Sequence, residues 1–359
     1  MKIAITGGAG FVGSHLAKAY LDAGHDVLVI DSLINGSRQT VDSRARFYHL
    51  DIRDTKLQTI LQLERPDVVS HHAAQRAPSF PGESSLSDAD VHVRGLLNVL
   101  ESCVGASVRK LIFASGGPTL YTPIPYSKYE RETLPIVRED APLCPQLPAD
   151  ITKVAGEWYV RYYTQQYGLE HTILRYAHIY GEKQSELAQH PAAYFISMLS
   201  QRQRPIIRGS AHDVCDHIFI DDVAQANLRT LERGRNCTMH ISSGEGYTLN
   251  QFFCAIAQHL SCELLPLHIS GSLGEPTAMV LDNTLARQQL GWQPEISFSE
   301  GIKRTVGFLC GNRVNQPQVQ AHARQRVAEP DARDRARSAA CPGTAGRQRP
   351  GSADRRRRA

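Results

Sequence analysis

The chain has 359 residues, of which 42% are hydrophobic and 21% charged, a composition typical of a soluble globular protein that can bury a substantial core. It contains no apolar run near the roughly 18 residues that span a bilayer, which argues against a membrane protein. The formal net charge of +4 comes from the end of the chain, because residues from Arg313 onward include 12 arginines and 4 acidic residues, so the basic charge does not indicate a nucleic-acid-binding cleft.

The termini and the cysteines favour a cytoplasmic protein. The N-terminal segment "MKIAITGGAGFVG" lacks the apolar core and cleavage site of a signal peptide. The eight cysteines are scattered and form no Cys-x-x-Cys pair, which favours reduced thiols over a disulfide framework or a zinc site. His71 and His72 end a predicted strand, where adjacent side chains face opposite ways, so we predict no metal site.

The first half of the chain alternates strands and helices. Residues 2–6 predict a strand, a glycine-rich turn leads into a helix at 14–24, and a second strand follows at 26–31. Further strands are predicted at 45–51, 67–73, 110–115 and 171–180, with helices at 93–104 and 153–168. This order predicts an α/β protein with a doubly wound parallel sheet of the Rossmann type, covered on both faces.

The second half is less regular. Helices are predicted at 192–203 and 298–309, between loops and short strands. We therefore expect a Rossmann domain at 1–175, to which about 211–245 returns, and a smaller substrate-binding lobe at 176–310. Residues 311–359 are rich in arginine, alanine and proline with few large apolar residues, which predicts a disordered tail.

Three glycines in the segment "TGGAGFVG" mark a dinucleotide site. Gly7, Gly10 and Gly13 lie between a strand and a helix, where small residues let backbone N–H groups approach a pyrophosphate. Asp31 ends the next strand, so its carboxylate can bind the adenosine ribose hydroxyls and would repel a 2′-phosphate. Asp51, beyond the third strand, is placed to reach the adenine. The pattern predicts NAD rather than NADP, with a glycine turn that binds no ligand as the alternative.

Further motifs follow in order: "DSLINGSR", "LDIRD", "DVVSHHAAQ", "KVAGEW", "LRYAHIYG", "IFIDDVAQA" and "NTLARQQLGW". With them, residues 1 to about 310 resemble the extended short-chain dehydrogenase/reductase family, the NAD-dependent nucleotide-sugar epimerases and dehydratases of the UDP-glucose 4-epimerase kind. The resemblance implies transient oxidation of a sugar by NAD, a nucleotide-sugar substrate and a homodimer with a four-helix interface. The cofactor-binding residues that it implies are Gly7, Gly10, Phe11, Val12, Gly13, Asp31, Ser32, Asp51, Ile52, Ala73, Ala74, Gln75, Lys153 and Tyr176.

The proton-transfer tyrosine of this family is missing. In the family, a tyrosinate four residues before a lysine removes the sugar hydroxyl proton, because the ammonium on the same helix face stabilises the phenolate. Lys153 is present in the segment "PADITKVAGE", but Ala149 stands at the tyrosine position. No lysine of the chain has a tyrosine four residues before it. The usual mechanism therefore requires another residue.

The hydroxyl that accompanies the tyrosine is also displaced. In the segment "ASGGPTLY" the family's serine or threonine position corresponds to Gly116 or Gly117. Two hydroxyls remain nearby, on Ser115 and Thr119. A loop tyrosine could also supply a phenol, although such residues more often pack or lie on the surface; the candidates are Tyr121, Tyr126 and Tyr129. The predicted catalytic residues are Lys153, Ser115, Thr119 and His178.

The substrate side departs from the family pattern as well. His178 stands where the family has asparagine, and its imidazole, which titrates near neutrality, is an alternative acid/base group. Cys215 and Ser272 occupy positions of arginines that bind diphosphate. The predicted substrate-binding residues are His178, Arg208, Cys215 and Glu275.

Two hypotheses remain. The first is an NAD-dependent epimerase or dehydratase with a relocated base. The second is a catalytically degenerate NAD-binding sensor or scaffold, motivated by the combined changes at Ala149, Gly117, Cys215 and Ser272. An engineered substitution at Ala149 would explain one of these changes and leave the others.

Overall fold

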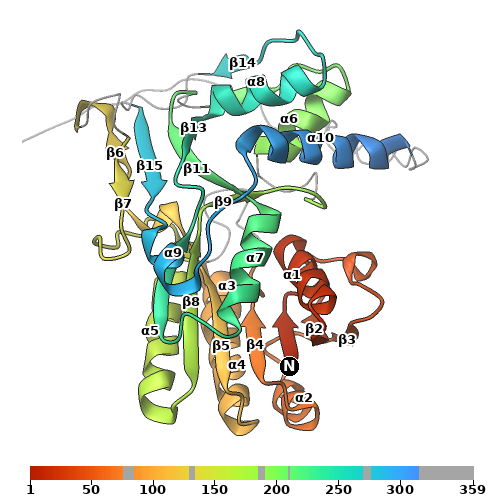
Figure 1. The fold of residues 1–359 in the computed structure, drawn as a ribbon, viewed down its shortest axis with the longest axis vertical. Coiled ribbons are helices and arrows are strands. Elements are labelled where there is room, and N and C mark those ends of the chain that lie inside the picture. Colours follow the sequence, from red (N-terminus) through yellow and green to blue (C-terminus); the bar gives the residue numbers. More distant parts are fainter. Residues whose placement is uncertain (76–84, 129–133, 185–190, 209–210, 270–275, 315–359) are drawn as a thin grey trace, which may run out of the picture. The chain divides into compact units, whose positions relative to one another are not determined.

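The computed structural model describes residues 1–75, 85–128, 134–184, 191–208, 211–269 and 276–314. A seven-stranded sheet with the strand order β12-β8-β5-β4-β1-β2-β3 forms its centre (Figure 1). All its strand pairs are parallel. This confirms the predicted Rossmann-type fold. The strands are β1 (Lys2–Thr6), β2 (Asp26–Asp31), β3 (Arg46–His49), β4 (Val68–His71), β5 (Lys110–Ser115), β8 (Glu170–Tyr176) and β12 (Cys237–Ile241).

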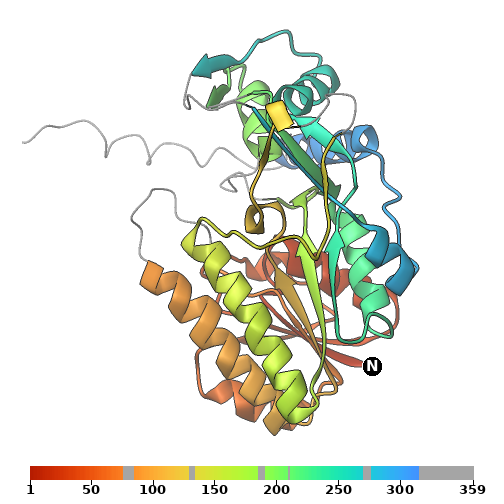
Figure 2. The same cartoon turned by 90° about the vertical axis from the view of Figure 1, so that its left-hand side faces the viewer.

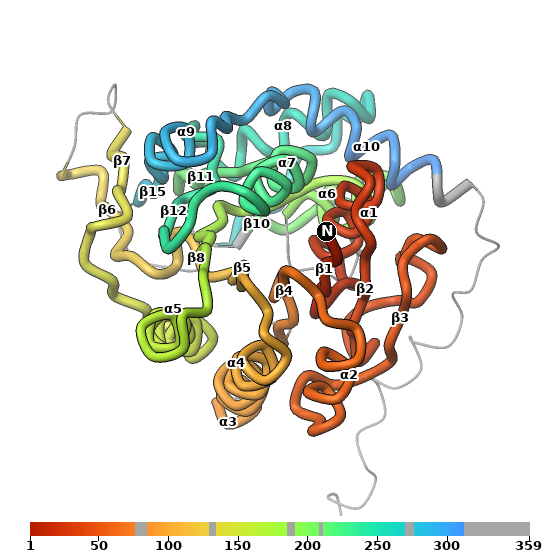
Figure 3. Tube along the Cα trace, turned by 60° about the horizontal axis from the view of Figure 1, so that its bottom comes forward, coloured from red at the N-terminus to blue at the C-terminus, as the bar shows by residue number. Residues whose placement is uncertain are grey.

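Helices cover both faces of this sheet, as the end-on view in Figure 3 shows. One face carries α1 (Phe11–Asp22) and α7 (Ile220–Thr230), which pack on each other. The other carries α2 (Lys56–Glu64), α4 (Gly95–Gly105) and α5 (Pro148–Tyr167). A short helix α3 (Ser85–Ala89) and a π-helical turn η2 (Asp90–Arg94) lead into α4 and contact α5.

Alternation along β1 explains why two cores form. Ile3 and Ile5 pack into the cluster that includes Leu16 of α1, whereas Ala4 packs into the cluster that includes Leu57 of α2. Successive side chains of a strand point to opposite faces, so a strand that is apolar throughout must be covered on both sides. The near-continuous apolar sequence of β1 therefore requires the two helical layers.

A second group of elements forms a mixed sheet, which includes the strands at 124–125 and 136–137 from within the range predicted for the Rossmann domain. This sheet has the path β13-β11-β15-β6, with β7 paired to β15 and β9 to β11. The strands are β6 (Ile124–Pro125), β7 (Ile136–Val137), β9 (His178–Tyr180), β11 (Val214–Phe219), β13 (Gly246–Thr248) and β15 (Thr277–Leu281). Beside it lie α6 (Pro191–Ser200), α8 (Leu249–His259) and α10 (Phe298–Val314), with a two-stranded sheet of β10 (Ile206–Arg208) and β14 (Leu267–Ile269). Helix α9 (Thr284–Leu290) packs instead against β12 and α7.

Several predicted bounds differ from the structure. The helix predicted at 153–168 begins at Pro148, and the one predicted at 14–24 begins at Phe11. The segment 171–180 forms two strands, because the N–H of Ala177 donates to the carbonyl of Ile241 and the chain then leaves the parallel sheet to pair with β11. Helix α10 continues to Val314, beyond the expected start of the tail at residue 311, and residues 315–359 lie outside the described part. The domain boundaries themselves stay a prediction, although β12 does return to the parallel sheet from within 211–245. No helix in the described ranges is long and apolar enough to cross a bilayer.

Candidate functional site

The glycine turn forms a cradle between β1 and α1. Gly7 has a φ of +74°, and a Cβ atom there would lie 2.6 Å from the backbone nitrogen of Ala73. A Cβ on Gly13 would lie 2.3 Å from the carbonyl oxygen of Gly7. Glycine is therefore required at both positions. Helix α1 has no side-chain cap at Gly10, so the orphan N–H groups of its first turn need other partners, as an anion would provide.

Asp31 ties this cradle to the end of β2. One carboxylate oxygen accepts the N–H of Ala9 at 2.9 Å and the other accepts the N–H of Leu33 at 2.7 Å. Each oxygen keeps a second lone pair for a ligand hydroxyl. Arg38, the nearest cation along the chain, lies over the ring of Phe47 instead. The end of β2 is thus suited to a ribose diol.

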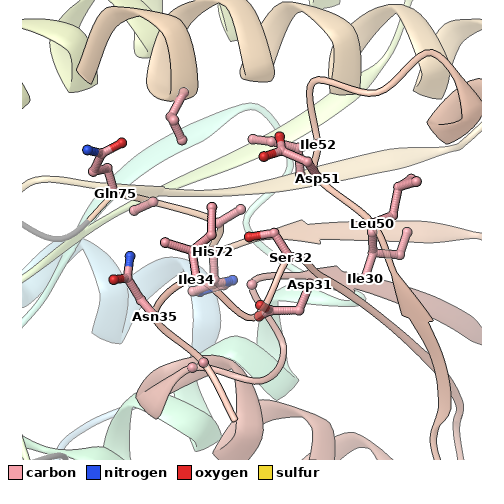
Figure 4. Close-up of a pocket in the computed structure, with 16 residues that line it drawn as sticks. Ile30, Asp31, Ser32, Ile34, Asn35, Leu50, Asp51, Ile52, His72 and Gln75 are labelled. Carbon is pink, nitrogen blue, oxygen red and sulfur yellow. The ribbon is translucent and has the colours of Figure 1, made fainter. Parts of the chain in front are cut away.

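A pocket opens at the carboxyl ends of β1, β2 and β4, and the side chains around it are shown in Figure 4. Asp31 and Ser32 lie in the middle of this view, with Asp51 and Ile52 across from Gln75. Arg53 lies on Asp51 in a bidentate contact and lowers the pKa of that carboxyl. The lining residues are Gly7, Gly10, Ile30, Asp31, Ser32, Ile34, Asn35, Gly36, Leu50, Asp51, Ile52, His72, Ala73, Ala74, Gln75 and Val91.

Most of the predicted cofactor residues therefore meet at one pocket. Phe11, Val12 and Gly13 lie in the first turn of α1 behind it, whereas Lys153 and Tyr176 are not among its lining residues. The prediction did not include the apolar lining residues Ile30, Leu50 and Val91, or Ile34, Asn35 and Gly36 after β2. The last three belong to the motif "DSLINGSR", which could have indicated them.

A histidine links the pocket to the start of α5. The N–H of Gln75 donates to Nε2 of His92 at 2.8 Å, so the imidazole proton is on Nδ1, which lies 2.9 Å from the Thr152 hydroxyl. Thr152 in turn donates to the carbonyl of Ala149 at 2.7 Å. Burial, followed by the charge of Lys153, lowers the pKa of His92 to about 3. The neutral ring therefore holds the pocket wall against the first turn of α5.

Lys153 lies at the carboxyl end of β5. Its Nζ donates to the carbonyl of Ala114 at 2.8 Å and lies over the ring of Phe113. Burial lowers the pKa of this amine to about 8, although Asp150 opposes the shift. One turn before it, Ala149 supplies only a methyl group. The structure therefore retains the cation and has no phenol at the preceding helical position.

Ser115 belongs to a buried ionic network. Its hydroxyl donates to Glu157 at 2.6 Å, and Arg175 makes a bidentate contact with the same carboxylate at 2.8 and 2.7 Å. Arg175 also donates to the Tyr121 hydroxyl, which lies 2.7 Å from His240. Burial raises the pKa of Tyr121 to about 12. These contacts engage both hydroxyls in the core, and a role of Ser115 in the relay stays a prediction.

The other loop tyrosines do not fill the gap in the described part. The Tyr126 hydroxyl donates to the carbonyl of His212, away from Lys153, and Tyr129 lies outside the described residues. Thr119, in contrast, donates to Asp150 at 2.7 Å, within the first turn of α5. The two predicted hydroxyls therefore flank Lys153 on α5: Thr119 bonds to Asp150 before it and Ser115 bonds to Glu157 after it.

Gly117 has a structural reason to be glycine. A Cβ atom at this position would lie 1.7 Å from the carbonyl oxygen of Tyr176 and 2.6 Å from its carbon. The backbone after β5 thus passes directly over the end of β8. The absence of a hydroxyl here follows from close backbone packing, and a serine could not occupy the same position.

The predicted substrate residues lie apart from the pocket. His178, on β9, packs against His217, and burial lowers its pKa, so the imidazole is neutral. Cys215, on β11, has a pKa raised to about 11 by burial. The hydroxyl of Tyr176 lies 3.1 Å from both His72 and Asn227, beneath the pocket. The side chain of Arg208, together with Ser272 and Glu275, lies outside the described part.

Comparison with known proteins assigns the family. A model of the NAD dependent epimerase/dehydratase family matches residues 3–241. The chain belongs to this family. Among the curated epimerases, UDP-glucose 4-epimerase from Mycolicibacterium smegmatis is 32% identical over an alignment that covers 86% of this chain and 98% of the relative.

Solved structures of epimerases share the fold. The crystal structure of UDP-glucose 4-epimerase from Thermotoga maritima with UDP-glucose has a TM-score of 0.81 and 32% identity, covering 87% of this chain and all of that one. UDP-glucose 4-epimerase from Thermus thermophilus, in complex with NAD, has a TM-score of 0.79 and 30% identity, covering 87% and 99%.

The pocket fits the cofactor of this family. The cradle at Gly7 and Gly13, which a Cβ would fill, and the uncapped start of α1 suit a pyrophosphate, and Asp31 suits the ribose of NAD. His71 interacts with Thr6 and Phe113, whereas His72 faces Tyr176, so the two imidazoles point different ways. Within the described ranges, no cluster of three or more metal-ligating side chains is found.

Proposed function

We propose that the protein is an NAD-dependent nucleotide-sugar epimerase that acts on a uridine-diphosphate sugar by transient hydride transfer, with a non-standard proton relay. The observation that carries the proposal is the glycine cradle and Asp31 at the ends of β1 and β2, on the same sheet edge as the buried amine of Lys153 at the end of β5. Parallel strands of this fold bring their carboxyl ends together, which is where its ligands bind.

Different residues of the chain bind the cofactor and stabilise the base. NAD, when bound, accepts a hydride from the sugar carbon. The backbone of the cradle and Asp31 hold the dinucleotide, and Lys153 binds the hydroxyls of the second ribose while its positive charge favours an anionic base nearby. The pKa of about 8 leaves this amine mostly protonated at neutral pH. We place the sugar nucleotide between this end of the sheet and the lobe that carries His178 and Cys215.

The alternative is a catalytically degenerate NAD-binding sensor or scaffold. Ala149 and Cys215 support it, because neither replaces the chemistry of the residue that stands there in the family. Gly117 no longer supports it, since only glycine fits beneath the Tyr176 carbonyl. With one of the changes explained by packing, the enzyme is the better-supported function.

The test uses the purified full-length chain, NAD and a panel of uridine-diphosphate hexoses, pentoses and hexuronic acids. We expect a sugar-dependent rise of reduced-cofactor absorbance and interconversion of one epimeric pair, measured by chromatography. NAD binding by calorimetry with no interconversion and no solvent or substrate isotope exchange across the panel would contradict the enzyme and favour the sensor.

We also propose a homodimer formed through α4 and α5, which lie side by side in Figure 2. Helix α5 and its cap expose large apolar side chains: Leu147 (58% exposed), Ile151 (52%), Trp158 (69%) and Tyr162 (50%). Such a stripe is typical of an interface. Light scattering should give the mass of two chains, and Trp158→Glu should shift it towards one; a monomeric unmodified chain would contradict the proposal.

The seven described cysteines are free thiols, which supports a cytoplasmic location.

A further inference from the structure

The turn that lacks the phenol carries a carboxyl group in the next position. Asp150 follows Ala149 in the first turn of α5, and its side chain is buried. Proton transfer at this site needs a basic group near the Lys153 ammonium, at the end of the sheet where we place the sugar. In the described part, the Tyr121 and Tyr126 hydroxyls are bonded elsewhere. Asp150 is therefore a candidate for that group, because it lies in the first turn of α5, beside Ala149, and interacts with the charge of Lys153.

The hydrogen bonding of Asp150 leaves one oxygen available. Thr119 donates its hydroxyl proton to Oδ1 at 2.7 Å. Among the described residues, no hydrogen bond is found for Oδ2, and it is not among the buried atoms that lack a partner. One carboxylate oxygen is thus oriented by a hydroxyl, while the other has no protein partner in the described part and keeps some exposure to solvent.

Charge and burial act on this carboxyl in opposite directions. Burial raises the pKa of Asp150, whereas the Thr119 hydroxyl and the Lys153 ammonium lower it. Asp150 and Lys153 are three residues apart, so they share a helix face, as a phenol and an ammonium four residues apart would. Asp88 of α3 and His92 of η2 are buried titratable groups on the elements packed against α5, and the neutral His92 is engaged with Thr152. Lys153 therefore supplies the charge that holds an anionic carboxylate ready as a base.

We propose that Asp150, oriented by Thr119, is the proton-transfer group that takes the place of the missing tyrosine. The assignment rests on the proposed function. The carboxylate takes the proton of the sugar hydroxyl, and the O–H bonding pair becomes the second bond of the new carbonyl. The hydride leaves the same carbon with its electron pair for NAD, so the carbon is oxidised by two electrons and NAD is reduced. In the reverse step, hydride returns to the carbon and Asp150 returns the proton to oxygen.

The test compares four variants of the full chain with NAD bound. Asp150→Asn keeps the shape and should lower the rate of sugar-dependent cofactor reduction by about 10²–10⁴-fold. Thr119→Val should lower it about tenfold, and Thr119→Ser should restore it, because the serine hydroxyl remakes the bond to Asp150. Asp140→Asn, at an exposed surface position, is the matched control and should leave the rate unchanged. Calorimetric affinity for UDP should stay within about threefold in all four.

A second measurement does not depend on turnover. In protein labelled with carbon-13 at aspartate carboxyls, the resonance missing from Asp150→Asn should titrate above the usual aspartate range and move in Thr119→Val but not in Thr119→Ser. A carboxyl that is insensitive to Thr119, or an Asp150→Asn variant as fast as Asp140→Asn, overturns the assignment and leaves the epimerase standing. If His178→Gln is inactive while Asp150→Asn remains active, the proton-transfer role belongs to His178 and the assignment to Asp150 is wrong. An unmodified chain that reduces no NAD with any sugar overturns both proposals.

Discussion

Replacing Gly117 by alanine is expected to destabilise the protein strongly, through backbone contact rather than through the lost flexibility of glycine. The new Cβ would lie 1.7 Å from the carbonyl oxygen of Tyr176, whereas real Cβ contacts do not fall below 3.0 Å, so the two segments must separate by about 1.3 Å. Neither is a side chain that can rotate away. The separation pulls at the end of the β5–β8 pairing, where Ser115 lies opposite Arg175.

The expected cost is about 3 kcal/mol or more, the upper range for inserting a methyl group into a packed site. For a chain of 359 residues, with an unfolding entropy of about 2.1 cal/mol/K per residue, that corresponds to a fall in Tm of roughly 4 °C or more. Gly116→Ala is the matched control, because a Cβ there meets only the side chain of Leu120, at 2.8 Å, which can change rotamer. Thermal unfolding followed by circular dichroism measures both. If Gly117→Ala melts within 2 °C or so of Gly116→Ala, the close approach to Tyr176 is wrong.

Three further outcomes are expected. Gly7→Ala should weaken NAD binding at least tenfold by calorimetry, because Gly7 has a positive φ and its Cβ would meet the backbone of Ala73; unchanged affinity would refute the cradle. Arg175→Met should cost about 3–5 kcal/mol in urea unfolding, since it leaves Glu157 buried and poorly paired, and adding Glu157→Leu should recover part of the loss; an equally unstable double variant would count against this account. Burial lowers the pKa of His92 to about 3 in the folded state, against about 6.5 in the unfolded state, so stability falls as pH drops below 6.5, and this group contributes about 1.4 kcal/mol per pH unit. His92→Gln should make that limb shallower by this amount, the other buried histidines keeping the rest, and parallel pH profiles would contradict it.

The fold and the cofactor half of the site follow from local sequence patterns. Strand, glycine turn, helix and second strand are adjacent in the chain, so their spacing alone places Gly7 and Asp31 at one pocket. The same holds for the parallel sheet, whose apolar strands and intervening helices are each visible within a short window. The comparisons confirm the family that these motifs indicate.

The reacting half depends on contacts between distant residues, which patterns do not reveal. Thr119 and Asp150 are 31 positions apart, and their hydrogen bond exists only because the loop after β5 passes the start of α5. Likewise, the sequence indicates that Gly117 replaces a serine, whereas the structure shows that the end of β8 leaves no room for a side chain there. Ser115 is a neighbour of the motif position, and the sequence does not show that its hydroxyl donates to Glu157. The sequence therefore predicts which segments lie near Lys153 but not the hydrogen bonds between their side chains.

The break at Ala177 has a mechanical consequence. This one residue separates β8 of the parallel sheet from β9 of the lobe, and β11 runs without a gap into α7, which packs on α1. These two junctions are short, so any movement of the mixed sheet relative to the parallel sheet would have to be absorbed by the few residues at the ends of these elements. The amide of Ala177, bonded to Ile241, should accordingly be among the slowest of the molecule to exchange with solvent.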